Sequence, residues 1–144
     1  LNDDYFKKNY PKSTGPDYFN LNWIYQAISK CKRKFQPQDV QATLLQLTVK
    51  TLTEGLLELE LNNDEIIFYC GGGLHNKYLM DQIEKELERE IFSTYELGVN
   101  PDYLEAISFA WFAKQRIDGR SFELSKITGS KGKVFLGTIT EPSK

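Results

Sequence analysis

An apolar run, three glycines and an amphipathic stretch follow one another directly between residues 66 and 88, and this order constrains the fold more than any other feature. Residues 66–70 (IIFYC) are apolar and rich in β-branched and aromatic side chains, which predicts a short strand. In residues 76–88 apolar side chains recur at helical spacing, at Leu79, Met80, Ile83 and Leu87. Strand, glycine turn and helix make half of a βαβ unit, and residues 91–93 (IFS) are a candidate second strand, parallel to the first.

A long amphipathic helix is predicted over residues 37–61. Its apolar stripe contains Val40, Leu44, Leu47, Leu52, Leu56 and Leu59. Pro37 suits the first turn, where its missing N–H has no partner to lose, and Asp39 favours the positive end of the helix dipole. We expect the helix to end at Asn62 and Asn63.

A third helix is predicted from Asn100, as the cap, to about Arg116, with Asp118 and Gly119 closing it. Residues 104–113 are apolar nearly all round, so we expect this helix to be largely buried. Glu105 is the one charge in that run, and an unpartnered buried carboxylate is costly. Two interpretations stay open: Glu105 binds a ligand, or it is a satisfied ion pair or helix-start carboxylate.

The two flanks of the chain are expected to be mostly irregular. Residues 1–22 contain Pro and Gly but also many aromatic residues, which indicates a packed loop followed by a short helix over residues 23–29. These aromatic residues are Tyr5, Phe6, Tyr10, Tyr18 and Phe19, with Trp23 just beyond them. Residues 120–144 contain one expected edge strand, 134–136.

The pattern is α-β-α-β-α, which predicts an α/β fold with a small, mainly parallel sheet. Because two short strands and an edge strand are few for three helices, we expect the rest of the sheet to precede Leu1 and the chain to be a fragment.

Composition excludes several classes of function. The net charge is -2, so we expect no nucleic-acid partner. No apolar run approaches the ~20 residues of a membrane span, and no signal peptide is visible. The two cysteines, Cys31 and Cys70, form no metal-binding or disulfide pattern, and free thiols suit a reducing cytosol. We therefore expect a cytoplasmic protein that has no membrane partner and no metal ligands of its own.

The glycine segment, residues 70–76 (CGGGLHN), is the strongest candidate for chemistry. Glycines after a strand let a ligand approach the backbone, and the N–H groups that begin the next helix attract phosphate. The segment is neither a Walker A motif nor a dinucleotide fingerprint. A tight turn that binds nothing remains the alternative, but three glycines are more than such a turn needs. His75 is interpreted as a polar loop or capping residue, because no adjacent Asp, Ser or Cys suggests a triad.

Four motifs, in order, resemble those of anhydro-N-acetylmuramic acid kinases. Residues 11–21 (PKSTGPDYFNL) resemble the family's PKSTG…FN segment, and residues 39–44 (DVQATL) its DVQATL helix start. Residues 70–76 resemble its CGGGAHN loop, with Leu74 in place of Ala. Residues 96–106 (ELGVNPDYLEA) resemble its ELGIDPDWVEA segment. The resemblance extends from about Pro11 to the C-terminus.

The resemblance implies a fold and a reaction. The family belongs to the sugar kinase, actin and heat-shock-chaperone ATPase superfamily, in which two lobes with ribonuclease-H-like cores hold ATP between them. Residues 1–144 would then be part of the C-terminal lobe, an incomplete sheet flanked by helices. The family phosphorylates the 6-oxygen of 1,6-anhydro-N-acetylmuramic acid while water opens the anhydro ring. The product is N-acetylmuramic acid 6-phosphate, an intermediate of peptidoglycan recycling. The family's catalytic aspartate and first phosphate loop would precede this chain, so we expect no catalytic residue here and no activity from the isolated chain.

The same resemblance assigns site residues and partners. Gly71, Gly72, Gly73 and Asn76 would line the ATP site, and Glu105 would hold the sugar. Mg²⁺ would bridge the phosphates without dedicated ligands in this half. The expected partners are the sugar, the N-terminal lobe of the same polypeptide and a second subunit in a homodimer. Two alternatives remain: another amino-sugar kinase of the superfamily, or a non-catalytic nucleotide-binding or assembly module.

Overall fold

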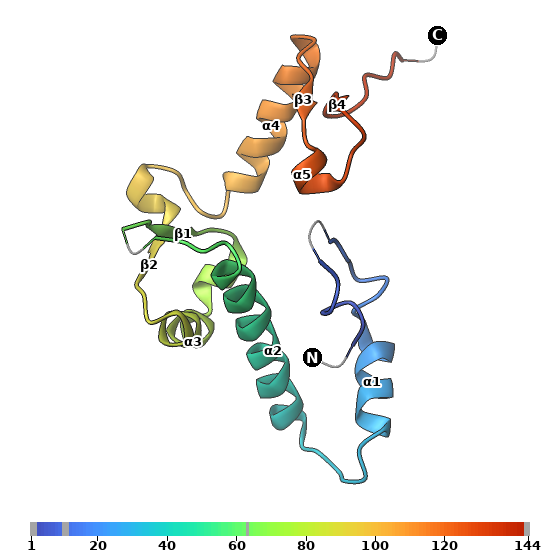
Figure 1. Ribbon diagram of the computed structural model, residues 1–144, viewed down its shortest axis with the longest axis vertical. Helices are drawn as coiled ribbons and strands as arrows, with labels where there is room; N and C mark the ends of the chain where they lie inside the picture. The colour runs from blue at the N-terminus through green and yellow to red at the C-terminus, as the bar shows by residue number, and fades with distance from the viewer. Residues whose placement is uncertain (1–2, 10–11, 63, 143–144) are drawn as a thin grey trace.

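The computed structural model describes residues 3–9, 12–62 and 64–142 (Figure 1). Tyr10, Pro11 and Asn63 lie outside the described residues. The helices are α1 (Leu21–Ser29), α2 (Pro37–Leu57), α3 (Lys77–Leu87), α4 (Leu104–Ile117) and α5 (Ser125–Thr128), with 3₁₀ turns η1 (Gly72–His75) and η2 (Thr94–Leu97). The strands are β1 (Ile67–Tyr69), β2 (Ile91–Ser93), β3 (Phe122–Glu123) and β4 (Lys133–Val134).

The core lies between α2, α3 and one face of a two-stranded parallel sheet. Strands β1 and β2 pair with Ile67 opposite Ile91, and α3 connects them. The predicted α/β class and βαβ unit are therefore confirmed. Val49 of α2 and Ile83 of α3 are each only 1% exposed, and they form the centre of the core. Around them pack Leu45, Leu56, Ile67, Tyr69, Leu79, Leu87 and Ile91.

Helix α2 begins as predicted and ends earlier. Pro37 occupies the first turn, and Gln36 and Asp39 form a reciprocal capping box. The expected end at residues 62–63 is wrong, because α2 stops at Leu57. Leu57 and Leu59 are 63% and 64% exposed, so the apolar stripe has no surface to cover beyond the core. Packing, not the apolar pattern, therefore sets this helix end.

The N-terminal segment is a packed loop, as its aromatic content predicts. Aromatic rings contact one another from Tyr5 and Phe6 through Phe19 to Trp23 of α1, with centroid distances of 4.9–5.5 Å. The Asp3 carboxylate accepts hydrogen bonds from Trp23 Nε1 (2.9 Å), Tyr18 Oη (2.8 Å) and the Tyr5 N–H. The Asp3 carboxylate thereby joins the start of this segment to Trp23 in α1, 20 residues further along the chain.

Helix α4 differs from its prediction in two respects. It begins at Leu104, not near Asn100, because residues 101–103 form a turn. The expectation that it is largely buried is also wrong: Gln115 is its only buried residue. Phe109 and Ile107 are 63% and 51% exposed. The helix points away from the α2–α3 core, which leaves these apolar side chains without a covering layer (Figure 1).

The C-terminal segment packs on α4 and not on the main sheet. Strands β3 and β4 form a separate antiparallel pair, with Phe122 opposite Val134. Trp111 of α4 contacts the Phe122 ring at 5.4 Å, and Arg116 Nε donates to the Gly137 carbonyl at 3.1 Å. The predicted strand at residues 134–136 is thus shorter, at Lys133–Val134, and it pairs with β3 across a connection that contains α5. Strands of two residues are too short to carry a periodic signal in the sequence.

The molecule exposes far more surface than its mass requires. Its accessible area is 11793 Å², whereas a compact monomer of 16.7 kDa exposes about 7600 Å². Large apolar side chains contribute, among them Trp111 (46% exposed) and Phe135 (53% exposed). The elements are arranged openly (Figure 1), and the exposed apolar side chains form surface that further protein could cover.

Candidate functional site

The candidate site lies at the carboxyl ends of β1 and β2. Because the two strands are parallel, the segments that follow them, residues 70–76 and 94–102, emerge at the same edge of the sheet. The N–H of Gly71 donates to the carbonyl of Pro101 at 3.0 Å, which joins the two segments directly. Ligands of open α/β sheets collect at this edge. The fold thus places the glycine segment where the sequence predicts.

Gly71 and Gly73 are each required by the chain's own geometry. Gly71 has φ 81° and ψ 176°, a conformation open essentially to glycine alone. A Cβ on Gly73 would lie 2.8 Å from Tyr69 Oη, closer than real contacts, and 3.2 Å from its ring, which is a tight contact. Tyr69 packs against the core, so its ring has limited room to move. Both glycines are therefore explained without a ligand.

Gly72 has no such internal explanation. It is exposed, its φ is not positive, and a Cβ there would meet nothing within 4 Å. Among the described residues, no carbonyl or side chain accepts a hydrogen bond from the N–H of Gly72 or of Gly73. Two donors at the start of the 3₁₀ turn are therefore available to an outside acceptor. The sequence argument that three glycines exceed the needs of a turn applies at Gly72.

Asn76 caps α3. Its side-chain oxygen accepts a hydrogen bond from the N–H of Leu79 at 3.1 Å, and the Met80 N–H donates to its carbonyl. The amide NH₂ group of Asn76 is left as the part of the side chain that could reach a ligand. The next residue, Lys77, pairs with Asp81 at 2.8 Å, and this hydrogen bond raises the pKa of Lys77.

His75 has a carboxylate partner that the sequence reasoning missed. Its Nε2 lies 2.7 Å from Oδ1 of Asp102, which is 27 residues further along the chain. The two residues are too far apart in sequence for adjacency along the chain to reveal the pair. A usable signal existed, because Asp102 follows the strand that pairs in parallel with the strand before His75. A carboxylate after the neighbouring strand is brought to the same edge.

Glu105 is exposed in the first turn of α4, three residues after Asp102. The argument that burial forces a partner on this carboxylate therefore does not hold, because the first turn of α4 leaves Glu105 exposed. A carboxylate at this position stabilises the helix through the positive dipole end. Its exposure and its position in the first turn agree with the interpretation as a helix-start carboxylate, and the contact with a ligand stays a prediction.

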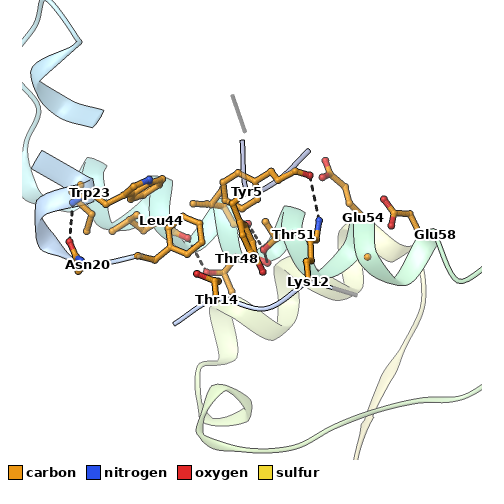
Figure 2. Close-up of a pocket in the computed structure, with 15 residues that line it drawn as sticks. Tyr5, Lys12, Thr14, Asn20, Trp23, Leu44, Thr48, Thr51, Glu54 and Glu58 are labelled. Carbon is orange, nitrogen blue, oxygen red and sulfur yellow. Dashed lines mark hydrogen bonds between the residues drawn. The ribbon is translucent and has the colours of Figure 1, made fainter. Parts of the chain in front are cut away.

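A hollow lies elsewhere, between the N-terminal segment, α1 and α2 (Figure 2). It has a volume of about 500 Å³, with Lys12 and Thr14 on one side, Glu54 on α2 and Glu58 just after that helix. Lys12 Nζ donates to the Phe6 carbonyl at 3.4 Å. The α2 hydroxyls at residues 48 and 51 donate to carbonyls of their own helix, so they are not free donors. Neither residues 71–76 nor Glu105 line this hollow. The glycine edge remains the candidate site, because the N–H groups of Gly72 and Gly73 have no acceptor among the described residues.

Two further properties concern ions and membranes. In the part of the chain that the structure describes, no three His, Cys, Asp or Glu side chains gather in a group able to hold a metal ion. Within the same residues, no helix combines the length and apolar character needed to cross a bilayer. Cys31 and Cys70 are free and exposed.

Comparison with known proteins gives a consistent result along the chain. The family model described as "Anhydro-N-acetylmuramic acid kinase" matches residues 1–142. Curated relatives of that name are 42% identical over 137 residues in Aliivibrio fischeri and 42% over 140 residues in Pseudomonas syringae pv. syringae. A third, from Legionella pneumophila (strain Corby), is 41% identical over 140 residues. These matches cover 94–96% of this chain but only 37–38% of the relatives' length.

Proposed function

The chain belongs to the anhydro-N-acetylmuramic acid kinase family, and from this membership we propose that it forms the C-terminal lobe of a two-lobed sugar kinase. The lobe would have a ribonuclease-H-like, actin-type core whose remaining strands come from outside residues 1–144. The thin two-stranded sheet and the excess exposed surface support this assignment. The same uncovered faces support contact with an N-terminal lobe and with a second subunit.

The proposed reaction is ATP-dependent phosphorylation of 1,6-anhydro-N-acetylmuramic acid. The γ-phosphoryl group is transferred to the 6-oxygen, a water molecule adds at the anomeric carbon, and the 1,6-anhydro bond breaks. The products are ADP and N-acetylmuramic acid 6-phosphate, so the enzyme would serve peptidoglycan recycling. The reaction belongs in the cytoplasm, where ATP is available and exposed thiols such as those of Cys31 and Cys70 stay reduced.

The observation that carries this proposal is Gly72, a glycine that the chain's own packing does not require. It stands at the carboxyl end of β1 between Gly71 and Gly73, and the N–H groups of Gly72 and Gly73 have no acceptor among the described residues. Backbone N–H groups without a side chain in front of them suit a nucleotide's phosphate or ribose oxygens. Gly71, Gly72, Gly73 and the Asn76 amide would line the ATP side, and Mg²⁺ would neutralise the phosphates.

Glu105 is proposed to hold the sugar, since a carboxylate accepts hydrogen bonds from two hydroxyls at once. Nothing in residues 3–9, 12–62 and 64–142 is proposed as the catalytic base, which would lie in the N-terminal lobe. The isolated chain would then be inactive, because half of the cleft is absent.

Substrate screening of the intact polypeptide tests the function. ATP and the anhydro sugar should yield ADP and a product heavier by one phosphoryl group and one water. N-acetylglucosamine and N-acetylmuramic acid are tested separately as alternative substrates. Phosphorylation of an ordinary amino sugar alone would assign the chain to another kinase of the superfamily. Absence of turnover with retained ATP binding would favour a nucleotide-binding or assembly module.

The variant Glu105→Gln tests the sugar contact, because it keeps the shape of the side chain and removes its charge. We expect KM for the sugar to rise about tenfold or more while ATP affinity is unchanged, since a charged hydrogen bond contributes roughly 1.5–3 kcal/mol. Glu86→Gln, an exposed glutamate on α3, is the matched control. Sugar kinetics equal to those of the control would remove Glu105 from the site.

A further inference from the structure

A side-chain contact joins the end of the glycine loop to the segment that leads into α4. His75, the last residue of the 3₁₀ turn, lies with Nε2 2.7 Å from Asp102 Oδ1. At the other end of the loop, the Gly71 N–H donates to the Pro101 carbonyl at 3.0 Å. The loop is thus tied at both ends to the same short segment.

Asp102 is itself held in place. Its N–H donates to the side-chain oxygen of Asn100 at 2.9 Å, which shapes the turn over residues 101–103 and presents the carboxylate to His75. Both side chains are largely in solvent, at 65% and 46% exposed. An exposed pair of this kind contributes little to the stability of a fold. Its effect on the position of the loop is therefore separable from any effect on folding.

Resting on the proposed function, we propose that the His75–Asp102 pair is a latch that positions the glycine loop relative to Glu105 for phosphoryl transfer. Glu105 lies three residues after Asp102, in the first turn of α4, so a shift of the loop against this segment is a shift against Glu105. Transfer between two bound substrates depends on their alignment, and a misplacement of about 1 Å can cost a hundredfold in rate. His75 and Asp102 are thus positioning residues that act through the loop.

The experiment uses the intact polypeptide and four variants: His75→Ala, Asp102→Ala, the double variant and His75→Gln. Glutamine places its amide nitrogen as many bonds from Cα as Nε2 of histidine, so His75→Gln retains the donor to Asp102. The control is Asp118→Ala, which removes an equally short exposed ion pair, 2.7 Å from Lys114, at the far end of α4. Each protein is measured for kcat and KM with both substrates, thermal midpoint, and amide hydrogen exchange of residues 71–76.

We expect His75→Ala and Asp102→Ala each to lower kcat/KM for ATP about tenfold or more. Both should also speed amide exchange at Gly71, Leu74 and Asn76, whose N–H groups are hydrogen-bonded in the loop. The double variant should be no worse than either single one, because the two residues act as a unit. His75→Gln should recover activity to within a few fold of wild type, with thermal midpoints all close to that of the control.

Unchanged amide exchange in His75→Ala would overturn the latch whether or not the enzyme is active. Additive losses, or kinetics equal to those of Asp118→Ala, would also overturn it. A wild-type protein without kinase activity would instead count against the proposed function, and the exchange measurement would still decide the latch.

Discussion

Alanine at each of the three consecutive glycines separates folding from binding. Gly71→Ala forces a Cβ into a conformation open essentially to glycine, which should lower the free energy of unfolding by about 1–3 kcal/mol. Gly73→Ala brings the new methyl to 2.8 Å from Tyr69 Oη and displaces a ring that packs on the core. Overpacking of this kind costs roughly 1–3 kcal/mol. Both variants should therefore weaken the fold before any ligand is considered.

Gly72→Ala should behave in the opposite way. Its methyl meets nothing within 4 Å and its φ is not positive, so the fold loses nothing. Restricting the unfolded chain should raise the free energy of unfolding by about 0.4–1 kcal/mol. In the intact enzyme the same methyl stands in front of the proposed nucleotide contacts. We expect ATP affinity to fall about tenfold or more, equivalent to ~1.4 kcal/mol.

Urea unfolding gives the stability of each variant, and titration calorimetry with ATP gives the affinity. Gly119→Ala is the matched control, because Gly119 has φ 68° with open space around it and lies beyond α4, away from the loop. It should be destabilised by roughly 1–2 kcal/mol and bind ATP normally. The reasoning is refuted if Gly72→Ala binds ATP as tightly as wild type. It is also refuted if that variant is destabilised as much as Gly71→Ala.

Two other predictions concern regions outside the site. Hydrogen bonds, first of all that from Trp23, lower the pKa of Asp3 below its ordinary value of 3.8. At a pH above 3.8 the ionised carboxylate therefore stabilises the packing of Tyr5, Phe6, Phe19 and Trp23. This stabilisation is lost as the pH falls through the lower pKa of the folded state. The indole N–H resonance of Trp23 should report the loss, Asp3→Asn should lack the transition, and a transition centred above 3.8 would contradict the assignment. In the core, Ile83→Ala should lower the free energy of unfolding by about 2–5 kcal/mol, because Ile83 is 1% exposed. Thr94→Val should raise the free energy of unfolding by about 1 kcal/mol, because the buried Thr94 hydroxyl has no hydrogen-bond partner among the described residues. A lower free energy on urea unfolding would contradict this and indicate that the hydroxyl has a partner.

Local chemistry made part of this structure predictable. Pro37 at the start of α2, the strand at residues 91–93 and the helix stripe ending at Leu87 all depend on periodicity and on backbone preferences of single residues. The position of the glycine segment at a sheet edge follows from the same patterns, because a strand followed by a helix has few possible arrangements. These elements, and with them the candidate loop, were predicted from residues close together in the chain.

The sequence by itself determined helices α1 to α4 in outline, strands β1 and β2 and the glycine loop, because each of these elements depends on residues close together in the chain. Only the tertiary structure decided that Asp102 meets His75, that α2 stops at Leu57, and that α4 keeps Glu105 and Phe109 exposed. The physical reason is that burial and pairing depend on which surfaces meet in space. An apolar helix face indicates that something should cover it, and only the packed molecule shows whether the same chain does so.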